Sequence, residues 1–446
     1  MDERGDDGRN EPLLGTKRVK PLLPLYTVTL FQALAFTVAK MPALSLRFQE
    51  FAGHEGWDAS AIAAALGKMA ALRNLLEFFA TPVLATWSDR VGRRKVMCIS
   101  CVALCVECAL LASVRSIWTL FLAHVLFGLF NDSNGTLESS CIADATPPGS
   151  ARVIALGKLY SVVGAAIVVG PALGGELAAI GGVAPLIVGC CLACASLAYM
   201  LYALPEYLPA GERAQQSGSS KAGGSASLLR DFAGLMARSP GLRWYVAAST
   251  LAQMALGAYA SVQALWAREA LGWDGRDLGR FLSVSGLTMM AAQSLLLPML
   301  LKAMHGREPA LAQLCLLVQA ARLAAYGFAP RGAWVYVASM ATTAGLCHNP
   351  VLRSLCSRSA GKAQQGLLAG GTSAVGTAAQ VLGSLLGSSV FAASLRSGLP
   401  LNIPLLLSAS FFLLAAASVA QGKRAEARHK AGAASAKLPE AVALGA

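Results

Sequence analysis

Apolar stretches of about 20 residues alternate with short polar connections over most of this 446-residue chain. Twelve such stretches can be read, near residues 22–46, 60–86, 96–113, 117–141, 152–178, 183–204, 241–266, 278–301, 309–328, 333–355, 366–392 and 400–421. A helix needs about 20 residues to cross the hydrocarbon of a bilayer. Each stretch is predicted to be helical, because lipid offers no water to backbone groups and the alternation of a membrane barrel is absent. The pattern predicts an all-α membrane protein with twelve transmembrane helices.

A polar segment separates the sixth stretch from the seventh. Residues 209–227 are rich in glycine, serine and alanine, a composition typical of a flexible linker. Apolar side chains then recur at helical spacing, namely Leu228, Leu229, Phe232, Leu235 and Met236. This spacing predicts a short amphipathic helix along the inner membrane surface, within a linker that spans residues 209–240.

The linker divides the predicted helices into two groups of six. A proline followed by a basic turn that contains glycine occurs in both groups, from Pro82 to Arg94 and from Pro298 to Arg307. Weak internal similarity of this kind is typical of transporters built from parallel repeats. We expect two pseudo-symmetric six-helix bundles flanked by two tails, with the bundles at 22–208 and 241–421 and the tails at 1–21 and 422–446.

Composition and charge place this fold in a membrane. Hydrophobic residues make up 55% of the chain and charged residues 14%, so a soluble fold would lack polar surface. The net charge of +13 does not indicate nucleic acid, because most lysines and arginines lie in the tails and in connections on one side of the predicted membrane. The positive-inside rule then places both termini in the cytoplasm. The polar N-terminal tail predicts no cleaved signal peptide, and both a plasma membrane and an endomembrane fit.

Enzymatic, ATP-driven and metal chemistry are not expected. The sequence has no phosphate-binding loop and no cofactor motif. The 11 cysteines lie almost entirely within apolar stretches, so disulfides are not expected either. Four of these cysteines form one helical stripe, Cys98, Cys101, Cys105 and Cys108. A thiolate path for a metal is conceivable there, but small-residue packing is favoured, and no metal site is predicted.

The connection after the second stretch carries a basic motif. It reads Ala85-Thr-Trp-Ser-Asp89-Arg90-Val-Gly92-Arg93-Arg94-Lys95. Gly92 permits a tight turn, the cations hold the loop in the cytoplasm, and Asp89 can pair with a neighbouring helix end. We predict a cytoplasmic gating motif made of Asp89, Arg90, Gly92, Arg93 and Arg94. A short basic loop without a special role is the alternative.

The fifth stretch carries a second motif, Gly164 followed by Gly170-Pro171-Ala-Leu-Gly174-Gly175. Proline bends a helix, and glycine faces let a neighbouring helix approach closely. Ordinary small-residue packing would explain the glycines equally well. The Asp89 motif resembles the loop signature of the major facilitator superfamily, and the Gly170 motif resembles that of its proton-driven antiporters.

Two further segments extend the resemblance to the tetracycline/proton antiporter branch. They are Asp144, which follows the fourth stretch, and Leu204-Pro205-Glu206, which closes the sixth. The resemblance covers roughly residues 22–421 and implies two bundles that alternate access to a central site. One departure weakens the transfer of mechanism from the branch: His124 stands where the branch usually has an arginine associated with proton coupling. Histidine titrates near neutrality and arginine does not, so proton coupling in this chain is a hypothesis.

Ionisable residues inside the apolar stretches are candidates for a substrate or proton site, because charge is costly in lipid. They are Asp132, His124, Arg73, Glu77, Glu107, Lys40 and Arg322. Asp132 lies near mid-depth and is the preferred acid, with His124 about two turns away on the same helix. Arg73 and Glu77 are four residues apart, so they can pair with each other or contact substrate. Lys40 can face a cavity or extend towards the membrane surface.

These patterns favour a secondary active transporter that moves a small organic solute by alternating access, with proton antiport preferred. Its expected partners are a small-molecule substrate, protons and the lipid bilayer, and a monomer is expected. An organic-anion uniporter or symporter is the alternative, because Lys40, Lys68, Arg73 and Arg322 would make a cavity positive. A receptor or scaffold without flux is a third class, and flux in liposomes separates it from the other two.

Overall fold

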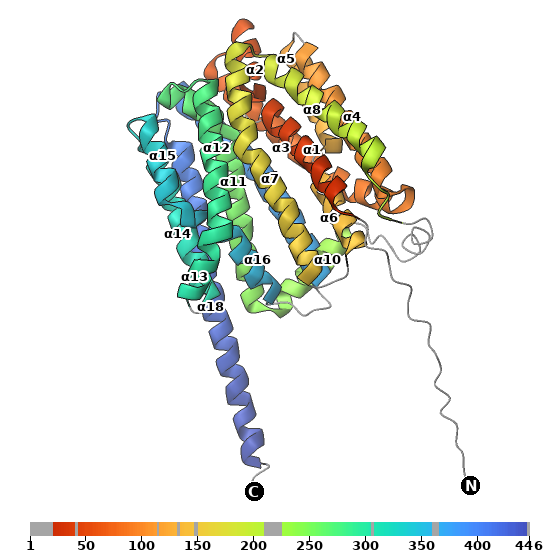
Figure 1. Ribbon diagram of the computed structural model, residues 1–446. Coiled ribbons are helices and arrows are strands. Elements are labelled where there is room, and N and C mark those ends of the chain that lie inside the picture. The colour runs from red at the N-terminus through yellow and green to blue at the C-terminus, as the bar shows by residue number, and fades with distance from the viewer. Residues whose placement is uncertain are drawn as a thin grey trace, which may run out of the picture.

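Helices form all of the regular secondary structure in the part of the chain that the structure describes (Figure 1). The computed structural model describes residues 21–40, 43–113, 116–131, 134–146, 150–208, 225–304, 307–358 and 365–443. Over these ranges the prediction of an all-α protein is confirmed. Asp132, linker residues 209–224 and nearly all of the N-terminal tail lie outside them.

The helices of the first half pack around α1 and α4. They are α1 (Leu23–Lys40), α2 (Ala43–His54), α3 (Ala59–Val91), α4 (Arg93–Ser113), α5 (Ile117–Asn131), α6 (Asn134–Ala145), α7 (Ser150–Ile180) and α8 (Ala184–Ala203). Helix α1 packs against α7 and α8, and α4 packs against α5 and α8. The predicted span at 22–46 corresponds to α1 with α2, and that at 117–141 to α5 with α6.

The helices of the second half pack around α11 and α18. They are α11 (Pro240–Leu271), α12 (Gly275–Ala291), the π-turn η1 (Ala292–Leu296), α13 (Leu297–Ala303), α14 (Glu308–Gly327), α15 (Gly332–Ala341), the 3-10 turn η2 (Thr343–Cys347), α16 (His348–Arg358), α17 (Gln365–Ser397) and α18 (Ile403–Ala443). Helix α11 packs against α17 and α18, and α14 packs against α18. Helix α18 continues well beyond the predicted span at 400–421, and its end projects from the other helices in Figure 1.

Two pairs of helices join the halves. Helix α3 packs against α17, and α7 packs against α12, a pair that lies side by side in Figure 1. The predicted amphipathic helix is present as α10 (Ser225–Arg238). Its Phe232 and Leu235 are buried, and Phe232 fills the space where Gly371 of α17 has no side chain. This part of the apolar face therefore packs on protein.

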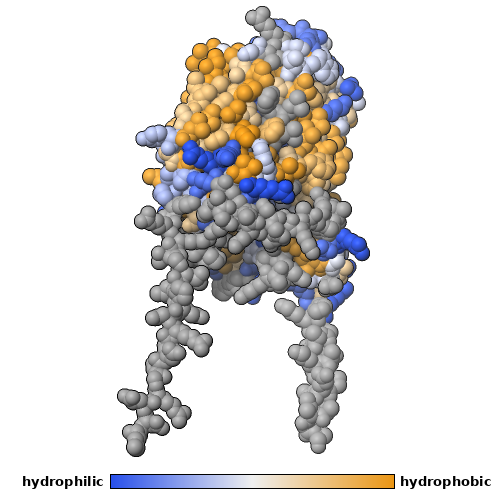
Figure 2. All heavy atoms as spheres, turned by 90° about the vertical axis from the view of Figure 1, so that its right-hand side faces the viewer, coloured by the Kyte–Doolittle hydropathy of each residue, from blue (hydrophilic) through white to orange (hydrophobic). Residues whose placement is uncertain are grey.

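Apolar side chains cover much of the outer surface. Figure 2 shows a broad hydrophobic area with hydrophilic residues gathered at its margins, and the exposed side chains include Phe79, Val83, Trp118, Leu122 and Ile187. Eight described helical segments are long and apolar enough to cross a membrane. The remaining four predicted spans coincide with α3, with α11, and with two pairs of shorter helices, α5 with α6 and α15 with α16. A surface of this kind is stable only against lipid or a protein partner.

The turn at the Asp89 motif is shorter than predicted. The motif was expected to form a loop between spans ending at 86 and beginning at 96, but α3 continues to Val91 and α4 begins at Arg93. The chain reverses at Gly92 alone, whose φ is +115°. Residues other than glycine rarely adopt that backbone conformation. A single residue can therefore make the turn only because it is glycine.

The predicted helix at 333–355 is divided, which corrects the expectation of one continuous span. Helix α15 ends at Ala341, and the chain passes through η2 into α16. The Thr342 and Thr343 hydroxyls donate to carbonyls of the preceding turn, at Ala338 and Met340, which competes with regular helix geometry. A Cβ at Gly345 would lie 2.8 Å from Oε1 of Gln319 on α14, so the divided helix brings its backbone against α14.

Candidate functional site

Arg93 joins three acceptors at the junction of α3 and α4. Its Nη2 lies 2.6 Å from Oδ1 of Asp89, its Nε donates to Oδ2 of Asp144 on α6 at 3.0 Å, and its Nη1 donates to the Ser88 hydroxyl at 2.5 Å. The guanidinium is buried whereas Arg90, three residues earlier, is exposed. Two carboxylates on one planar cation fix the relative position of α3, α4 and α6.

Glu206 caps the first turn of α4. Its Oε1 accepts the backbone N–H of Arg93 at 3.0 Å and its Oε2 accepts that of Arg94 at 3.3 Å. A carboxylate here satisfies orphan N–H groups and complements the helix dipole. The Arg94 guanidinium also donates to the carbonyl of Leu201 at the end of α8. The Asp89 motif, Asp144 and the Leu204-Pro205-Glu206 segment thus form one network, which we call the Arg93 network.

Four ionisable side chains from four helices meet inside the first half. Nζ of Lys40 on α1 lies 2.6 Å from Oε2 of Glu107 on α4, and both side chains are buried. The other carboxylate oxygen, Oε1, lies 3.0 Å from Nδ1 of His124 on α5. Nε2 of the same ring lies 3.2 Å from Nη1 of Arg73 on α3. We call this chain of contacts the His124 relay.

The relay fixes the protonation of the imidazole ring. An arginine side chain has only N–H donors, so Nε2 of His124 must accept the hydrogen bond from Arg73. The single ring proton then sits on Nδ1 and is donated to Glu107. A second proton on Nε2 would remove the acceptor and put two cations in contact, so a charged His124 and this position of Arg73 exclude each other.

Other predicted site residues lie elsewhere. Glu77 is half-buried on α3, one turn from Arg73, and Lys68 is exposed on the same helix. Arg322 on α14 is buried in the second half, where its Nε donates to the Tyr326 hydroxyl at 2.6 Å and its Nη2 to the Ser339 hydroxyl at 3.2 Å. Asp132, the preferred acid, lies outside the described residues, so its pairing with His124 stays a prediction.

The second motif lies on α7 and packs against α1 and α12. A side chain at Gly170 would collide with Thr37 of α1, whose hydroxyl donates to the Ala166 carbonyl at 3.2 Å. A Cβ at Gly175 would lie 2.5 Å from the Gly275 carbonyl oxygen, and one at Gly279 of α12 would collide with the Pro171 carbonyl. Gly174 is buried, whereas a Cβ at Gly164 would meet nothing within 4 Å. Backbone contact between α7 and α12 therefore requires glycine on both helices.

Polar contacts between the halves gather at one end of the molecule. Where both partners belong to the described ranges, these contacts are Gln49 with Arg268 at 2.6 Å, Ser60 with Arg396 at 2.9 Å, Glu176 with Arg280 at 2.8 Å and with Arg276 at 3.0 Å, and the Ala172 N–H with Ser283 at 2.9 Å. Hydrogen bonds from Ser60 and from the Ala61 N–H lower the pKa of Asp58, which caps α3 there. We call this the Arg268 end; the halves are joined at it.

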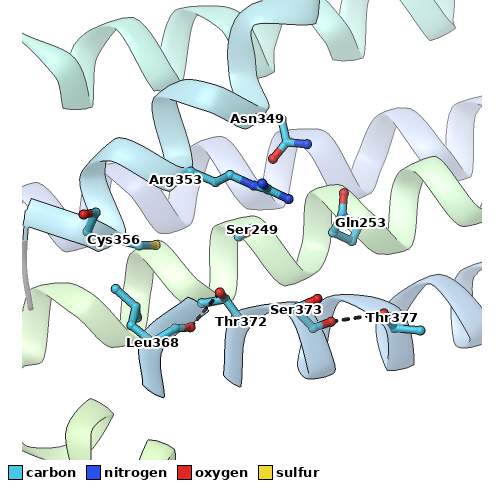
Figure 3. A pocket seen from close by; sticks show the side chains of 10 residues that line it. Ser249, Gln253, Asn349, Arg353, Cys356, Leu368, Thr372, Ser373 and Thr377 are labelled. Atoms are coloured by element: carbon cyan, nitrogen blue, oxygen red, sulfur yellow. Dashed lines mark hydrogen bonds between the residues drawn. The ribbon is translucent and has the colours of Figure 1, made fainter. Parts of the chain in front are cut away.

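A recess of about 410 Å³ opens among α11, α16 and α17 of the second half (Figure 3). Its ten lining residues are Ser249, Gln253, Asn349, Arg353, Cys356, Ser357, Leu368, Thr372, Ser373 and Thr377. Most carry hydroxyl or amide groups, and Arg353 is the one charged residue among the ten. The volume lies within the range of small-molecule sites, roughly 300–1,000 Å³.

This recess was not predicted from the sequence, because candidate site residues were chosen for their charge and not for hydroxyl or amide groups. Ser249 and Gln253 are four residues apart, and so are Ser373 and Thr377, which places each pair on one helix face. A search for uncharged polar residues at this spacing could have found the faces. It could not have shown that the faces of α11, α16 and α17 meet.

The cysteine stripe of α4 faces α8. All 11 cysteines are free, and Sγ of Cys105 lies 3.8 Å from Sγ of Cys194 on α8. Cys98 likewise lies 3.3 Å from the Met200 sulfur. No group of three or more histidine, cysteine or acidic residues that could hold a metal occurs within the ranges described. The stripe is a packing surface of soft side chains.

Eight described segments are long and apolar enough to cross a membrane, two halves meet through α3/α17 and α7/α12, and charged networks are buried inside, an architecture typical of a multi-pass membrane transporter. The chain belongs to the Major Facilitator Superfamily, whose sequence model matches residues 25–388. The family predicted from the Asp89 and Gly170 motifs is confirmed.

The chain is similar in sequence to two curated tetracycline resistance proteins. The chain is 26% identical over 385 residues to the class D tetracycline resistance protein of Salmonella ordonez, covering 85% of this chain and 91% of that protein. It is 27% identical over 255 residues to the class E tetracycline resistance protein of Escherichia coli, which covers 57% of this chain and 60% of the relative. The crystal structure of the nucleoside transporter NupG superposes with a TM-score of 0.73 over 90% of this chain and 99% of that one, at 14% identity. This similarity confirms the major facilitator fold.

Proposed function

We propose that this transporter exchanges a small organic solute for protons by alternating access, with the His124 relay as the proton-responsive element. The observation that carries the proposal is the contact of Arg73 with a neutral His124 inside a buried ion-pair chain. Similarity to tetracycline resistance proteins supports an organic solute.

A proton on Nε2 of His124 would release Arg73. The imidazolium would then stay beside Glu107, which lies between it and Lys40. Arg73 is on α3, and α3 packs against α17 of the other half. Release of Arg73 therefore acts on a helix at the interface between halves, where a small change in free energy shifts the population of two states.

Flux in proteoliposomes tests the proposal. With tetracycline as the first probe and a panel of organic acids, bases and neutral solutes after it, we expect solute movement against its gradient when a pH gradient is imposed. Collapse of that gradient with a protonophore should stop accumulation and leave exchange down the solute gradient. Accumulation that is unaffected by the protonophore would refute proton coupling, and no flux of any probe would refute transport.

The orientation is a separate prediction. We propose that residues 1–21, the linker at 209–240 and the tail at 422–446 are cytoplasmic, because most basic residues lie in these segments and in the connections on their side. Single cysteines in a cysteine-free background should react with a membrane-impermeant maleimide only after permeabilisation. A cysteine in the linker that reacts in intact cells would reverse the topology.

The glycine contact between α7 and α12 gives a prediction about the closed Arg268 end. Gly175→Ala places a Cβ 2.5 Å from the Gly275 carbonyl oxygen and 3.1 Å from Cα of Gly279. Backbone atoms cannot rotate away, so we expect a cost of about 1–3 kcal/mol in the state where these helices touch. A single cysteine at Ala172 should become more reactive towards thiol reagents, while Gly164→Ala, on the same helix with nothing within 4 Å, should leave that reactivity unchanged.

A further inference from the structure

The recess between α11, α16 and α17 contains a positive charge that no described carboxylate neutralises. Arg353 extends from α16 towards the space between Asn349 and Gln253 (Figure 3). Within the described ranges no acidic side chain lies within the 4.0 Å ion-pair distance of its guanidinium. Glu308 contacts α16, but its carboxylate forms an ion pair with Arg358 at 3.6 Å and accepts a hydrogen bond from the Ser354 hydroxyl at 3.3 Å. Arg353 therefore presents its donors to the recess.

The groups around Arg353 suit a polar ligand. The amides of Gln253 and Asn349 each offer donors and acceptors. The Thr377 hydroxyl donates to the Ser373 carbonyl at 3.1 Å, so its oxygen is left to accept a hydrogen bond. Such a lining favours a ligand that has an anionic group for the guanidinium and hydrogen-bonding groups beside it.

Gly376 of α17 lies beside Gln253, one of the residues that line the recess. A Cβ at Gly376 of α17 would lie 3.4 Å from Cγ of Gln253 and 3.7 Å from its Nε2. A larger side chain would press on the Gln253 amide and reduce the room beside it. The shape of the recess therefore depends on residues from two helices of the second half.

We propose that this recess binds the anionic group of a small polar organic acid and that Arg353 determines the preference for acids. The proposal rests on the proposed transport function and names the substrate class. The competing role for Arg353 is that of a latch. In that role Arg353 would pair with an acid of the first half when the halves close at the end opposite the Arg268 end. A latch would act on every substrate equally, whereas a binding residue acts on acids alone.

Calorimetric titration of the purified full-length protein separates the two roles. The probes are benzoate, hippurate and N-acetylglutamate, each compared with its neutral amide. We expect at least one acid to bind about tenfold more tightly than its amide, and Arg353→Gln to weaken that acid about tenfold while changing its amide by less than about twofold. Arg353→Lys should retain part of the preference. Arg358→Gln, on the same helix but paired with Glu308, is the matched control and should retain all of it.

Each other outcome overturns the inference. If none of the acids binds better than its amide, or if Arg353→Gln weakens acids and amides alike, the recess is not an anion site. Flux measurements keep this result distinct from the proposed function, because the chain would still move neutral or cationic probes. Gly376→Val provides a second variant without a charge change and should weaken hippurate more than benzoate, since the narrowed wall excludes the larger acid first.

Discussion

Glu107→Gln is expected to abolish proton-driven accumulation and to destabilise the first half. The substitution keeps the shape of the side chain but leaves the Lys40 ammonium buried without an anion. Removing one partner of a buried ion pair costs about 3–5 kcal/mol. Thermal unfolding in detergent should therefore shift to lower temperature, and uphill transport should fall to background. Exchange of solute down its own gradient should persist in the protein that remains folded.

A double variant separates the loss of coupling from the loss of stability. Lys40→Met with Glu107→Gln removes both charges and retains an oxygen acceptor for Nδ1 of His124. Neutral replacement of a buried pair is often tolerated, so thermal stability should return towards that of the unmodified chain. Uphill transport should remain absent. Full recovery of uphill transport in this variant would show that Lys40 and Glu107 are only a structural ion pair.

Glu138→Gln is the matched control for a buried carboxylate. Glu138 lies in the same half, on α6, and is 4% exposed, but it is not part of the His124 relay. Its neutralisation should leave proton-driven accumulation within about twofold of the unmodified chain. The Asp132 prediction is tested beside it: if Asp132 and His124 couple proton movement to transport, Asp132→Asn should abolish gradient-driven accumulation and leave exchange of solute down its own gradient.

Arg93→Ala is expected to slow turnover about tenfold or more while leaving substrate affinity within about twofold. The substitution removes the cation shared by Asp89 and Asp144 and leaves both carboxylates without it. Both acids are partly exposed to solvent, so we expect a loss of about 1–2 kcal/mol rather than the full cost for buried charge. The network joins α3, α4 and α6, so its loss changes the balance between transport states. Turnover in proteoliposomes and equilibrium binding of the same probe measure the two quantities.

Arg90→Ala is the control for this experiment. Arg90 belongs to the same basic motif and carries the same charge, but it is exposed and lies one residue from the end of α3. Turnover of Arg90→Ala should resemble that of the unmodified chain. Equal losses of binding and turnover in Arg93→Ala, or equal effects of the two alanine variants, would contradict a conformational role for the Arg93 network.

The hydropathy pattern predicted the helices because a lipid environment permits few alternatives. Stretches of about 20 apolar residues must be helical where no water can satisfy the backbone. Local chemistry predicted where two helices meet, since Gly92 alone allows the positive φ that joins α3 to α4. Helix ends and irregular turns were less accurate. Neither η2 nor the long extension of α18 was predicted, because hydropathy does not reveal where a helix is divided or how far it continues into water.

The candidate residues could be named from the sequence, but their partners could not. Ionisable side chains are costly in lipid, and this alone identified Lys40, Arg73, Glu107 and His124 as candidates. These residues lie on four different helices. Their order in the relay depends on how α1, α3, α4 and α5 pack, and sequence spacing predicts neighbours only within one helix.

By itself the sequence determined the helical class, the family and the two glycine-containing motifs, because each depends on local pattern or spacing. Tertiary structure decided that Asp144 and Glu206 complete the Arg93 network, and that the Arg353 recess draws its lining from three helices. These contacts join residues far apart in the chain, and their distances follow from the packing of whole helices rather than from any local preference of the backbone.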